Sequence, residues 1–461
     1  MPLIKSISGI RGTIGGTVSD NLTPVDAVKF ASAYGTMIKR QVVSSRPRVV
    51  VGRDGRISGP VVQDLVVASL RSVGIDVIDL GLSTTPTVEV AVPLENADGG
   101  IILTASHNPI EWNALKLLNS AGEFLDAEAG AEVLRLAEAE DFDYAPVLEL
   151  GEVEKKNDYI DRHIDRVLKL DGVDVEAIRQ ADFSIAVDGV NSTGGIAIPR
   201  LLEALGVRKV TALYCEPTGH FPHNPEPLAE HLTDLSETVV QEGCDLGIVV
   251  DPDVDRLAFI SEDGSMFGEE YTLVACADHY LKIHPGNTVS NMSSSRALRD
   301  VTEMHGQSYK ASAVGEVNVV KAMKETNATI GGEGNGGIIL PALHYGRDAL
   351  VGVALFLTHL AAGGKKMTEL RASYPSYFMS KQKIQLAAGM DVDGLLAQMA
   401  EKYAELSPTT IDGVKIDFPK EWVHLRKSNT EPIIRVYSES GTAENAKALA
   451  DRFRTELLAL T

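Results

Sequence analysis

Short apolar runs recur along this chain of 461 residues, and amphipathic segments separate them. Residues 48–51, 101–103 and 246–250 have the length and the β-branched content of buried strands. Residues 60–73 and 159–168 instead place apolar side chains three to four positions apart, as on one face of a helix. Strands that alternate with helices in this way predict α/β units.

The starts of some helices are marked by their own signals. Thr23 and Pro24 predict the beginning of a helix. We assign the inner face of this helix to Val25, Val28, Phe30 and Ala31.

The length is typical of roughly three or four domains. Residues 151–157 are polar and mark the first expected boundary. Beyond about residue 366 the pattern changes, with a strand expected at 433–437 and a final helix from Ala443. The hydrophobic content of 44% is that of a globular chain with sizeable cores.

The charge balance narrows the classes of partner. With 43 basic and 64 acidic residues the net charge is −21, which opposes general binding to nucleic acid or to an anionic membrane. It does not oppose a local basic pocket for a small anion.

The cysteines and the N-terminus add two expectations. Cys215, Cys244 and Cys276 stand singly, so neither a disulfide framework nor a zinc knuckle is indicated. Residues 1–16 have no apolar core typical of a signal peptide, and no run reaches the ~18 apolar residues of a membrane span. We therefore expect a cytoplasmic protein without a membrane partner.

Ser106 and His107 occupy a chemically suggestive position. They follow the apolar run 101–103 and precede the turn signal Asn108–Pro109, so Ser106 should lie on a tight loop at the end of a strand. Ligands bind at such ends in open α/β sheets, and a hydroxyl held there can act as a nucleophile or carry a phosphoryl group. An ordinary serine in a polar turn fits these residues equally well.

Asp251, Asp253 and Asp255 directly follow a strand. Like charges this close repel one another unless a cation lies among them, and ligands that are all oxygen indicate a hard ion such as Mg²⁺. An EF-hand is excluded because Arg256 replaces the glycine at its sixth position and because strands flank the loop. The nucleophilic aspartate of a phosphatase remains an alternative for Asp251.

Two glycine-rich segments suit ligand binding. Residues 9–16 are expected to form a glycine-rich loop, and Arg11 within it suits an anion; taken alone, these residues fit a flexible N-terminal loop better. Residues 332–337 contain G-x-G-x-x-G, but residues 338–341 cannot open the helix that a dinucleotide site needs. This second loop presents Glu333 and Asn335, whose side chains suit a polyhydroxy ligand.

A cluster of cationic and polar side chains follows near the C-terminus. Forked guanidinium groups, hydroxyls and turn N–H groups all suit phosphate oxygens. The cluster contains Arg426, Lys427, Ser428, Asn429, Thr430 and Arg435.

Four of these motifs together resemble the α-D-phosphohexomutase family. They occur in the family's order and at similar spacing over essentially the whole chain: Thr104–Pro109, Asp251–Arg256, Gly332–Gly336 and Arg426–Pro432. The resemblance implies an α/β protein with three related α/β domains and a C-terminal α+β helix-on-sheet domain around a central cleft. The expected domains are residues 1–152, 153–256, 257–366 and 367–461.

The resemblance also implies an activity. Phosphate would be exchanged between the 1- and 6-positions of a hexose through a phosphoserine at Ser106 and a 1,6-bisphosphate, which also serves as activator. One Mg²⁺ ion would be held by Ser106, Asp251, Asp253 and Asp255. Arg11, Arg256 and Lys116 would balance the negative charge, and Arg426, Ser428, Asn429, Thr430 and Arg435 would bind the substrate's own phosphate. His107 and Lys116 are candidate proton carriers, and Lys116 would need a lowered pKa to act as a base.

The identity of the sugar rests on the third loop. Asn335 and Gly337 replace the serine and histidine of many bacterial relatives, and Glu316 replaces a histidine or aspartate of others. A Glu-x-Asn loop resembles that of archaeal-type phosphoglucosamine mutases, so we expect glucosamine phosphate, with phosphomannomutase/phosphoglucomutase activity as the alternative. We expect a monomer or homodimer. A non-catalytic protein that binds sugar phosphates is a further alternative.

Overall fold

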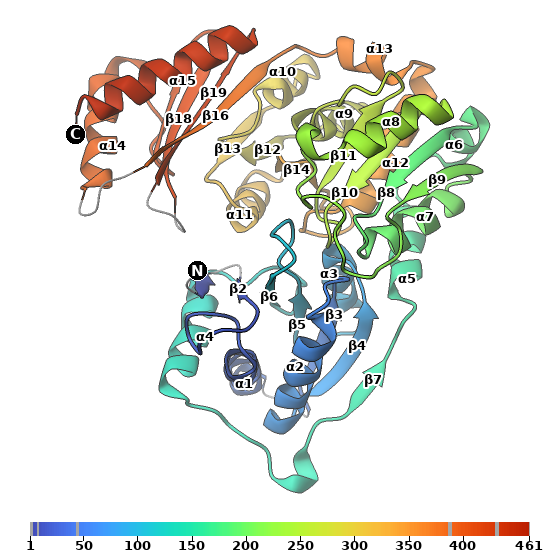
Figure 1. Cartoon of the computed structure of the whole chain (residues 1–461), viewed down its shortest axis with the longest axis vertical. Helices are drawn as coiled ribbons and strands as arrows, with labels where there is room; N and C mark the ends of the chain where they lie inside the picture. The colour runs from blue at the N-terminus through green and yellow to red at the C-terminus, as the bar shows by residue number, and fades with distance from the viewer. Residues whose placement is uncertain (1–2, 7–8, 43–45, 386–389, 429–432, 461) are drawn as a thin grey trace.

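The computed structural model describes residues 3–6, 9–42, 46–385, 390–428 and 433–460. These residues form four units, each built on its own β-sheet. Figure 1 shows the second (green), third (yellow to orange) and fourth (red) units in an arc above the first (blue). In the described part of the chain, no helix combines the length and apolar character needed to cross a membrane.

The first unit has a seven-stranded sheet whose central strands are buried on both faces, while its two edge strands are exposed. Its order is β1 (Ile4–Ser6), β2 (Gly9–Thr13), β6 (Trp112–Leu118), β5 (Gly99–Leu103), β3 (Arg48–Arg53), β4 (Asp76–Leu82) and β7 (Val153–Lys155). One face packs on α1 (Pro24–Gln41), α2 (Gly59–Val73) and α4 (Ala127–Ala139), and the other packs on α3 (Thr85–Leu94). The short turn η1 (Val147–Glu149) follows α4.

Helix α1 begins as the sequence predicts, but one inner residue is wrong. Thr23 caps the helix and Pro24 is its first residue. Phe30 and Ala31 are buried, whereas the side chain of Val25 is 55% exposed. The helix turns its buried face through Ala27, Phe30, Ala31 and Tyr34, and Val25 lies away from that face.

The second and third units share one fold. The second sheet runs β11 (Leu257–Ser261), β10 (Leu246–Val250), β8 (Ser184–Asp188) and β9 (Lys209–Leu213). The third runs β15 (Gly337–Ile339), β14 (Ile330–Glu333), β12 (Thr288–Asn291) and β13 (Tyr309–Ser312). In each sheet three strands are parallel and the fourth pairs antiparallel at one edge.

Strands β3 to β6 of the first unit repeat this topology. If the four strands of each unit are numbered 1 to 4 along the chain, they lie side by side in the sheet in the order 2-1-3-4 in all three units. Strands 3 and 4 form an antiparallel pair in each. The connection between these two strands is therefore the same structural position in all three units. The expectation of three related α/β domains is confirmed.

Most helices of the second and third units pack into one continuous core, whereas the helices at residues 233–242 and 316–326 pack in two smaller cores. Those of the second unit are α5 (Tyr159–Val167), α6 (Val175–Ala181), α7 (Gly194–Ala204) and α8 (Thr233–Glu242), with the turn η2 (Ala229–His231) before α8. Those of the third are α9 (Glu269–Ile283), α10 (Ala297–Met304), α11 (Glu316–Thr326), α12 (Ala349–Gly363) and α13 (Met367–Ala372).

The expected domain limits differ from the sheets at three places. Strand β7 lies beyond residue 152 but pairs with β4 of the first sheet. Strand β11 lies beyond residue 256 but pairs with β10 of the second. Met367 and Leu370 of α13 lie beyond residue 366 but belong to the shared core. Hydrogen-bond partners far away in sequence, rather than local composition, decide these limits.

The fourth unit is an antiparallel sheet covered by helices on one face. Its order is β16 (Phe378–Gln385), β19 (Ile433–Ser440), β18 (Trp422–Lys427) and β17 (Val414–Asp417). Helices α14 (Val392–Lys402) and α15 (Ala443–Leu458) pack on its apolar face, and the turn η3 (Ala404–Leu406) follows α14. This is the helix-on-sheet domain expected at the C-terminus.

Candidate active site

The three equivalent strand connections open into one cleft. The connection between β5 and β6, residues 104–111, is called the serine loop. The connection between β10 and β11, residues 251–256, is called the carboxylate loop. The turn that joins β14 to β15, residues 332–337, is called the sugar loop after its expected ligand. A cleft of about 650 Å³ brings together side chains from all four units, including Ser106, Arg256, Asn335 and Arg426. The predicted shared cleft is therefore present.

The serine loop holds Ser106 in an unusual backbone conformation. Ser106 has φ +50°, in the left-handed region that few non-glycine residues adopt. Its N–H donates to Thr104 Oγ1 at 2.9 Å, and its own Oγ lies 3.3 Å from His107 Nδ1. Such strained positions persist only where the surrounding structure holds them in place.

Arg56 supplies that support, and the sequence analysis assigned it no role. Its fully buried guanidinium pairs with Asp54 at 3.0 Å. The four remaining N–H groups donate to carbonyls of the serine loop and of β6, at 2.5–3.0 Å: Ser106, Asn108, Pro109 and Trp112. The only sequence signal was an arginine in the segment that follows β3.

The carboxylate loop is similarly strained. Val254 has φ +65°, which is rare for a β-branched residue, and its side chain is buried in the shared core. The N–H groups of Asp255 and Arg256 both donate to Asp251 Oδ1, at 3.2 and 3.1 Å. The loop thus folds back on its first carboxylate.

Asp253 and Asp255 each use only one carboxylate oxygen for hydrogen bonds within the described part of the chain. Asp253 Oδ2 accepts from Lys116 Nζ at 2.7 Å and from Thr85 Oγ1 at 2.6 Å. Asp255 Oδ2 accepts from Arg347 at 2.7 Å. The Oδ1 atoms of Asp253 and Asp255 are buried without a hydrogen-bond partner among the described residues.

This arrangement fits a divalent cation. Ligand oxygens of the three carboxylates lie within 4.8 Å of one another, and Ser106 Oγ donates to Asp251 Oδ2 at 2.7 Å. Burial and the two neighbouring carboxylates hold the pKa of Asp251 well above its usual range. A hard cation with oxygen ligands would satisfy the unpartnered atoms and relieve this repulsion.

Lys116, on β6, serves as a partner of these carboxylates. Its ammonium group lies 2.7 Å from Asp253 and 3.4 Å from Asp255. Burial alone would lower the pKa of Lys116, but the two carboxylates outweigh burial and raise it. The lowered pKa that a lysine base requires is therefore not present in this arrangement.

His107 has the opposite tendency. Burial and the nearby Arg256 and Arg11 guanidinium groups lower the pKa of its imidazole well below the usual value. The ring is therefore neutral at pH 7, with one nitrogen near Ser106 Oγ. A neutral imidazole at this position can accept a proton.

Arg11 and Arg256 line the cleft on either side of His107. Arg11 lies on strand β2 and pairs with Ala114 of β6, so the glycine-rich segment is partly a strand, contrary to expectation. Its guanidinium donates to Asn108 Oδ1 at 2.9 Å. Arg256 pairs with Glu226 at 3.0 Å. Together they place two guanidinium groups near the three aspartates.

The sugar loop forms a hairpin, which excludes a dinucleotide fold here. Glu333 pairs with Gly337 across the hairpin. The carboxylate of Glu333 accepts from Asn291, the Gly315 N–H and Arg347, at 2.8–3.1 Å. Asn335 lines the cleft, and its Oδ1 accepts from the Gly337 N–H at 3.2 Å.

Arg347 joins the carboxylate loop to the sugar loop. Its buried guanidinium pairs with Asp255, Glu316 and Glu333, at 2.7–2.9 Å. These carboxylates outweigh burial and hold the pKa of Arg347 well above its usual range. The sequence analysis missed this residue, because a single arginine before a helix is no signal until its partners are known.

The fourth unit supplies the opposite end of the cleft. Arg426 of β18 and Arg435 of β19 stand directly opposite each other, and both line the cleft. Like charges in this position repel. Asp412 already pairs with Arg426 at 2.8 Å, and an anion between the two arginines would balance the remaining positive charge. Ser428 is buried, and its N–H donates to the Ile433 carbonyl at 3.0 Å. Asn429 and Thr430 lie outside the described residues.

Lys381 of β16 is a further cation on the same face. It pairs with Tyr437 in the sheet, and both line the cleft with His424. The alternation of β16, in which Lys381 and Lys383 lie two residues apart, could have revealed a cationic face. That strand was not recognised in the sequence.

Comparisons with known proteins agree with this geometry. Four family models for phosphoglucomutase/phosphomannomutase match the chain in order: alpha/beta/alpha domains I, II and III over residues 4–144, 161–264 and 268–377, and the C-terminal domain over residues 382–456. Together they extend over most of the chain.

Individual relatives match at full length. A phosphoglucomutase/phosphomannomutase of Thermococcus kodakarensis is 40% identical over 441 residues, which cover 95% of each chain. A probable phosphoglucosamine mutase of Methanopyrus kandleri is 32% identical and covers 97% of this chain and 96% of its own. The crystal structure of a phosphoglucomutase/phosphomannomutase family protein from Burkholderia thailandensis has a TM-score of 0.83 at 25% identity, covering 99% of this chain and 98% of its own.

The resemblance drawn from four short motifs is thus confirmed over the whole chain. With its three repeated α/β units, its helix-on-sheet unit and a cleft shared by all four, the chain belongs to the phosphoglucomutase/phosphomannomutase family of phosphohexomutases.

Proposed function

We propose that this phosphohexomutase interconverts glucosamine 6-phosphate and glucosamine 1-phosphate. The route passes through a phosphoserine at Ser106 and a hexose 1,6-bisphosphate, which also serves as activator. The observation that carries the proposal is the polarity of the cleft. Ser106 of the first unit lines the cleft and is hydrogen-bonded to a buried carboxylate, and Arg426 and Arg435 of the fourth unit line the same cleft. A sugar with a phosphate at each end suits such a cleft.

The serine end provides charge balance for phosphoryl transfer. A phosphoserine adds about −1.5 to −2 charge. Asp251, Asp253, Asp255 and Ser106 Oγ would hold Mg²⁺, which when bound neutralises charge on the phosphoryl oxygens. Arg11, Arg256 and Lys116 add cations around the same point. Positioning and charge stabilisation are what this chemistry chiefly requires.

The proton that the attacking hydroxyl loses indicates a role for His107. As a sugar hydroxyl attacks the phosphoryl group, its O–P bond forms, the bond to Ser106 Oγ breaks, and the hydroxyl proton must leave. His107 is the neutral acceptor nearest Ser106, at 3.3 Å. Lys116 remains protonated beside Asp253 and orients that carboxylate.

Completion of the reaction requires the bisphosphate to exchange its ends. The Arg426–Arg435 pair would bind whichever phosphate is not reacting, so one distal site serves both half-reactions. Arg347 keeps the carboxylate and sugar loops in register while the ligand turns, because its guanidinium contacts both.

The preference for glucosamine is supported by two features. The first is Asn335, which offers an amide to a nitrogen substituent on the sugar. The second is the carboxyl group of Glu270, which lines the cleft beside the same loop and whose pKa is raised to about 8 by burial. A full-length relative is named probable phosphoglucosamine mutase. The name of the 40% identical relative supports phosphoglucomutase/phosphomannomutase activity as a second candidate.

The test compares kcat/KM for the 6-phosphates of glucosamine, glucose and mannose. We expect glucosamine 6-phosphate to be preferred, and Asn335→Ser to reduce that preference by roughly 2–10-fold, the value of one hydrogen bond. Asn318→Ser, in the same cleft, is the matched control. Equal or greater activity on glucose or mannose would refute the glucosamine preference and leave a mutase of broader substrate range.

A separate measurement distinguishes a phosphatase that uses Asp251. Protein incubated with bisphosphate is digested and analysed by mass spectrometry with and without hydroxylamine. A hydroxylamine-resistant phosphate on Ser106 is the expected result. A labile phosphate on Asp251 would overturn the mutase mechanism. An unmodified protein without turnover would indicate a binding protein.

A further inference from the structure

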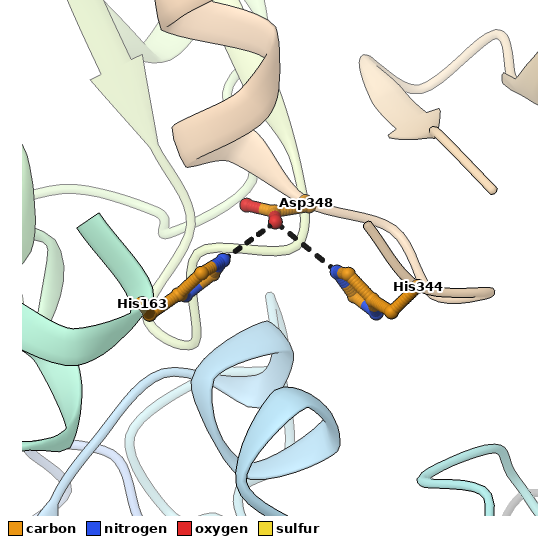
Figure 2. Close-up of side chains that lie close together, drawn as sticks. All are labelled: His163, His344 and Asp348. Atoms are coloured by element: carbon orange, nitrogen blue, oxygen red, sulfur yellow. Dashed lines mark hydrogen bonds and ion pairs between the residues drawn. The ribbon is translucent and has the colours of Figure 1, made fainter. Parts of the chain in front are cut away.

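A second cluster of potential metal ligands lies outside the cleft, where three units meet. His163 comes from α5 of the second unit, and His344 and Asp348 come from the third unit, just before α12. Figure 2 shows both imidazole rings directed at the Asp348 carboxylate. Thr87 and Glu89 of α3, in the first unit, contact the same rings.

The ligand atoms converge on one point. The Nε2 atoms of His163 and His344 lie 2.9 and 3.1 Å from the same oxygen, Asp348 Oδ2, and the ligand atoms all lie within 4.8 Å of one another. Ligands of a tetrahedral zinc ion lie about 3.3 Å apart, as bond lengths near 2.0–2.1 Å require. The other oxygen, Oδ1, accepts from the N–H groups of Leu350 and Val351 and so orients the carboxylate.

The opposite nitrogen of each ring faces an acceptor. His163 Nδ1 lies 3.0 Å from Thr87 Oγ1, and His344 Nδ1 lies 3.4 Å from Glu89 Oε2. Histidines that bind metals generally donate their second N–H to a carboxylate or another oxygen, which directs the other nitrogen to the ion. His163 has the environment that this pattern requires, whereas the contact between His344 Nδ1 and Glu89 is an ion pair and not a hydrogen bond.

The charge balance also favours a cation. Asp348 and Glu89 are each 1% exposed, and neither oxygen of Glu89 has a hydrogen-bond partner among the described residues. Burial alone would lower the pKa of His344, but Asp348 and Glu89 outweigh burial and raise it to about 10. In the ion-free protein a proton on this ring therefore balances one of the two buried carboxylates, and a divalent ion would displace that proton. We propose that His163, His344 and Asp348 bind a divalent transition-metal ion, for which Zn²⁺ is the best match because imidazole and carboxylate are its usual ligands.

A similar cluster elsewhere shows what a metal-free arrangement looks like. Asp278 also contacts two histidines, but His305 uses Oδ1 and His359 uses Oδ2. Lys282 and Tyr374 complete its hydrogen bonds at 3.0 and 3.2 Å. The Lys282 ammonium group already balances the charge of Asp278. The Asp278 cluster is therefore the matched comparison for the proposed metal site.

The proposed ion would connect three units beside the active site. Helix α3 begins at Thr85, whose hydroxyl and N–H both bind Asp253. Asp348 follows Arg347, which binds the carboxylate and sugar loops. An ion that fixes α3 against α5 and α12 would therefore hold these loops in place, so its role is structural.

The experiment uses the full-length protein without a histidine tag, in excess Mg²⁺ so that the carboxylate loop is saturated. Co²⁺ is titrated, followed by Zn²⁺, and the zinc protein is examined by X-ray absorption spectroscopy. We expect one Co²⁺ per chain with visible absorption typical of tetrahedral coordination, its displacement by Zn²⁺, and a zinc shell containing two imidazoles. Glu89→Gln should weaken binding by about 10–100-fold, as for other groups that orient a ligand.

Variants locate the ion. The double change His163→Gln with His344→Gln should abolish Co²⁺ binding, whereas His305→Gln should retain it. Absence of bound Co²⁺, an oxygen-only zinc shell, or binding lost in Asp253→Asn but kept in the double variant would each overturn the proposal. Spectroscopy of the unmodified protein decides the question if the double variant does not fold.

Discussion

Two residues in left-handed conformations, Ser106 and Val254, lie at the centre of the site. Neither is glycine, so each conformation costs about 1–3 kcal/mol. Arg56 holds the serine loop by donating to the carbonyls of that loop. The carboxylate loop is held by hydrogen bonds to Asp251 and by the burial of Val254. In this conformation Ser106 Oγ donates to Asp251 Oδ2, at the place where we propose phosphoryl transfer.

The first prediction concerns the carboxylates. Asp253→Asn should lower kcat by about two orders of magnitude or more, since a weakened Mg²⁺ site loses several kcal/mol of transition-state stabilisation. The fold should persist, because Lys116 keeps Asp255 as a partner. Steady-state kinetics and circular dichroism check this, with Asp263→Asn in an exposed turn as control. Unchanged activity at limiting Mg²⁺ would refute the metal assignment.

The second prediction concerns Arg56. Arg56→Lys should lower the free energy of unfolding of the first unit by about 3 kcal/mol or more, because an ammonium group cannot satisfy all five acceptors and buried carbonyls lose partners. Its kcat should also fall. Urea unfolding is followed by Trp112 fluorescence in a Trp422→Phe background, since these are the chain's two tryptophans.

Arg46→Lys is the control for this measurement. Arg46 is exposed, and it contacts Asp76, Glu152 and the Leu150 carbonyl at the surface, so its replacement should change stability by less than about 1 kcal/mol. Equal stability of the Arg46 and Arg56 variants would show that Arg56 does not hold the serine loop.

At the scale of elements, the repeated strand order explains where the site forms. Three units place a loop at the same position, between their third and fourth strands, and each loop carries a different function. In the fourth unit the alternation of the sheet separates two faces. Val423, Leu425 and Val436 pack on helices, whereas Arg426, Arg435 and Tyr437 line the cleft.

The third prediction concerns the contact between β18 and the third unit. His424 accepts from Ser293 Oγ and donates to the Asp412 carbonyl, and burial lowers its pKa to about 4. The unfolded chain, with a histidine pKa of about 6.5, binds the proton first. Stability of the fourth unit should therefore be full above about pH 6.5 and fall by up to about 3 kcal/mol as the pH decreases to about 4.

Thermal unfolding between these pH values checks this prediction. Trp422 fluorescence in a Trp112→Phe background reports on the fourth unit. His424→Gln should flatten the pH dependence, because the amide does not titrate. A slope unchanged by the substitution would assign the acid sensitivity to other groups.

At the scale of the whole molecule, charge is unevenly distributed. The chain carries a net charge of −21, yet the cleft gathers Arg11, Arg256, Arg347, Lys381, Arg426 and Arg435. Anionic ligands are therefore attracted to the cleft and repelled by the rest of the negatively charged molecule. Because the distal arginines belong to a separate sheet, we expect the fourth unit to close over bound ligand.

The fourth prediction tests this distal site. Arg426→Ala should weaken binding of glucosamine 6-phosphate by roughly 1.5–3 kcal/mol, the value of a hydrogen bond to a charged group. Phosphorylation of Ser106 should persist, because the serine and carboxylate loops are untouched. Titration calorimetry provides the measurement. Lys427→Ala, the next residue on the same strand, is the control because its exposed side chain pairs with Asp393 instead. Unchanged affinity of the Arg426→Ala variant would refute the assignment of Arg426 to the substrate-phosphate site in the cleft shared by the four units.

The sequence by itself determined the candidate site residues that line the cleft or its buried carboxylate cluster. Ser106, the three aspartates, Asn335 and Arg426 stand in short motifs beside recognisable strands, and both features are local. Helix starts such as Thr23–Pro24 were equally accessible, because a cap depends on its nearest neighbours.

Only the tertiary structure decided how these residues act together. Arg56 meets carbonyls about 50 residues away, and Arg347 meets three carboxylates from separate loops. The register of β18 and β19 sets Arg426 opposite Arg435, and the proximity of Asp253 raises rather than lowers the pKa of Lys116. Such pairings arise from packing between distant segments, and no local pattern of residues encodes them.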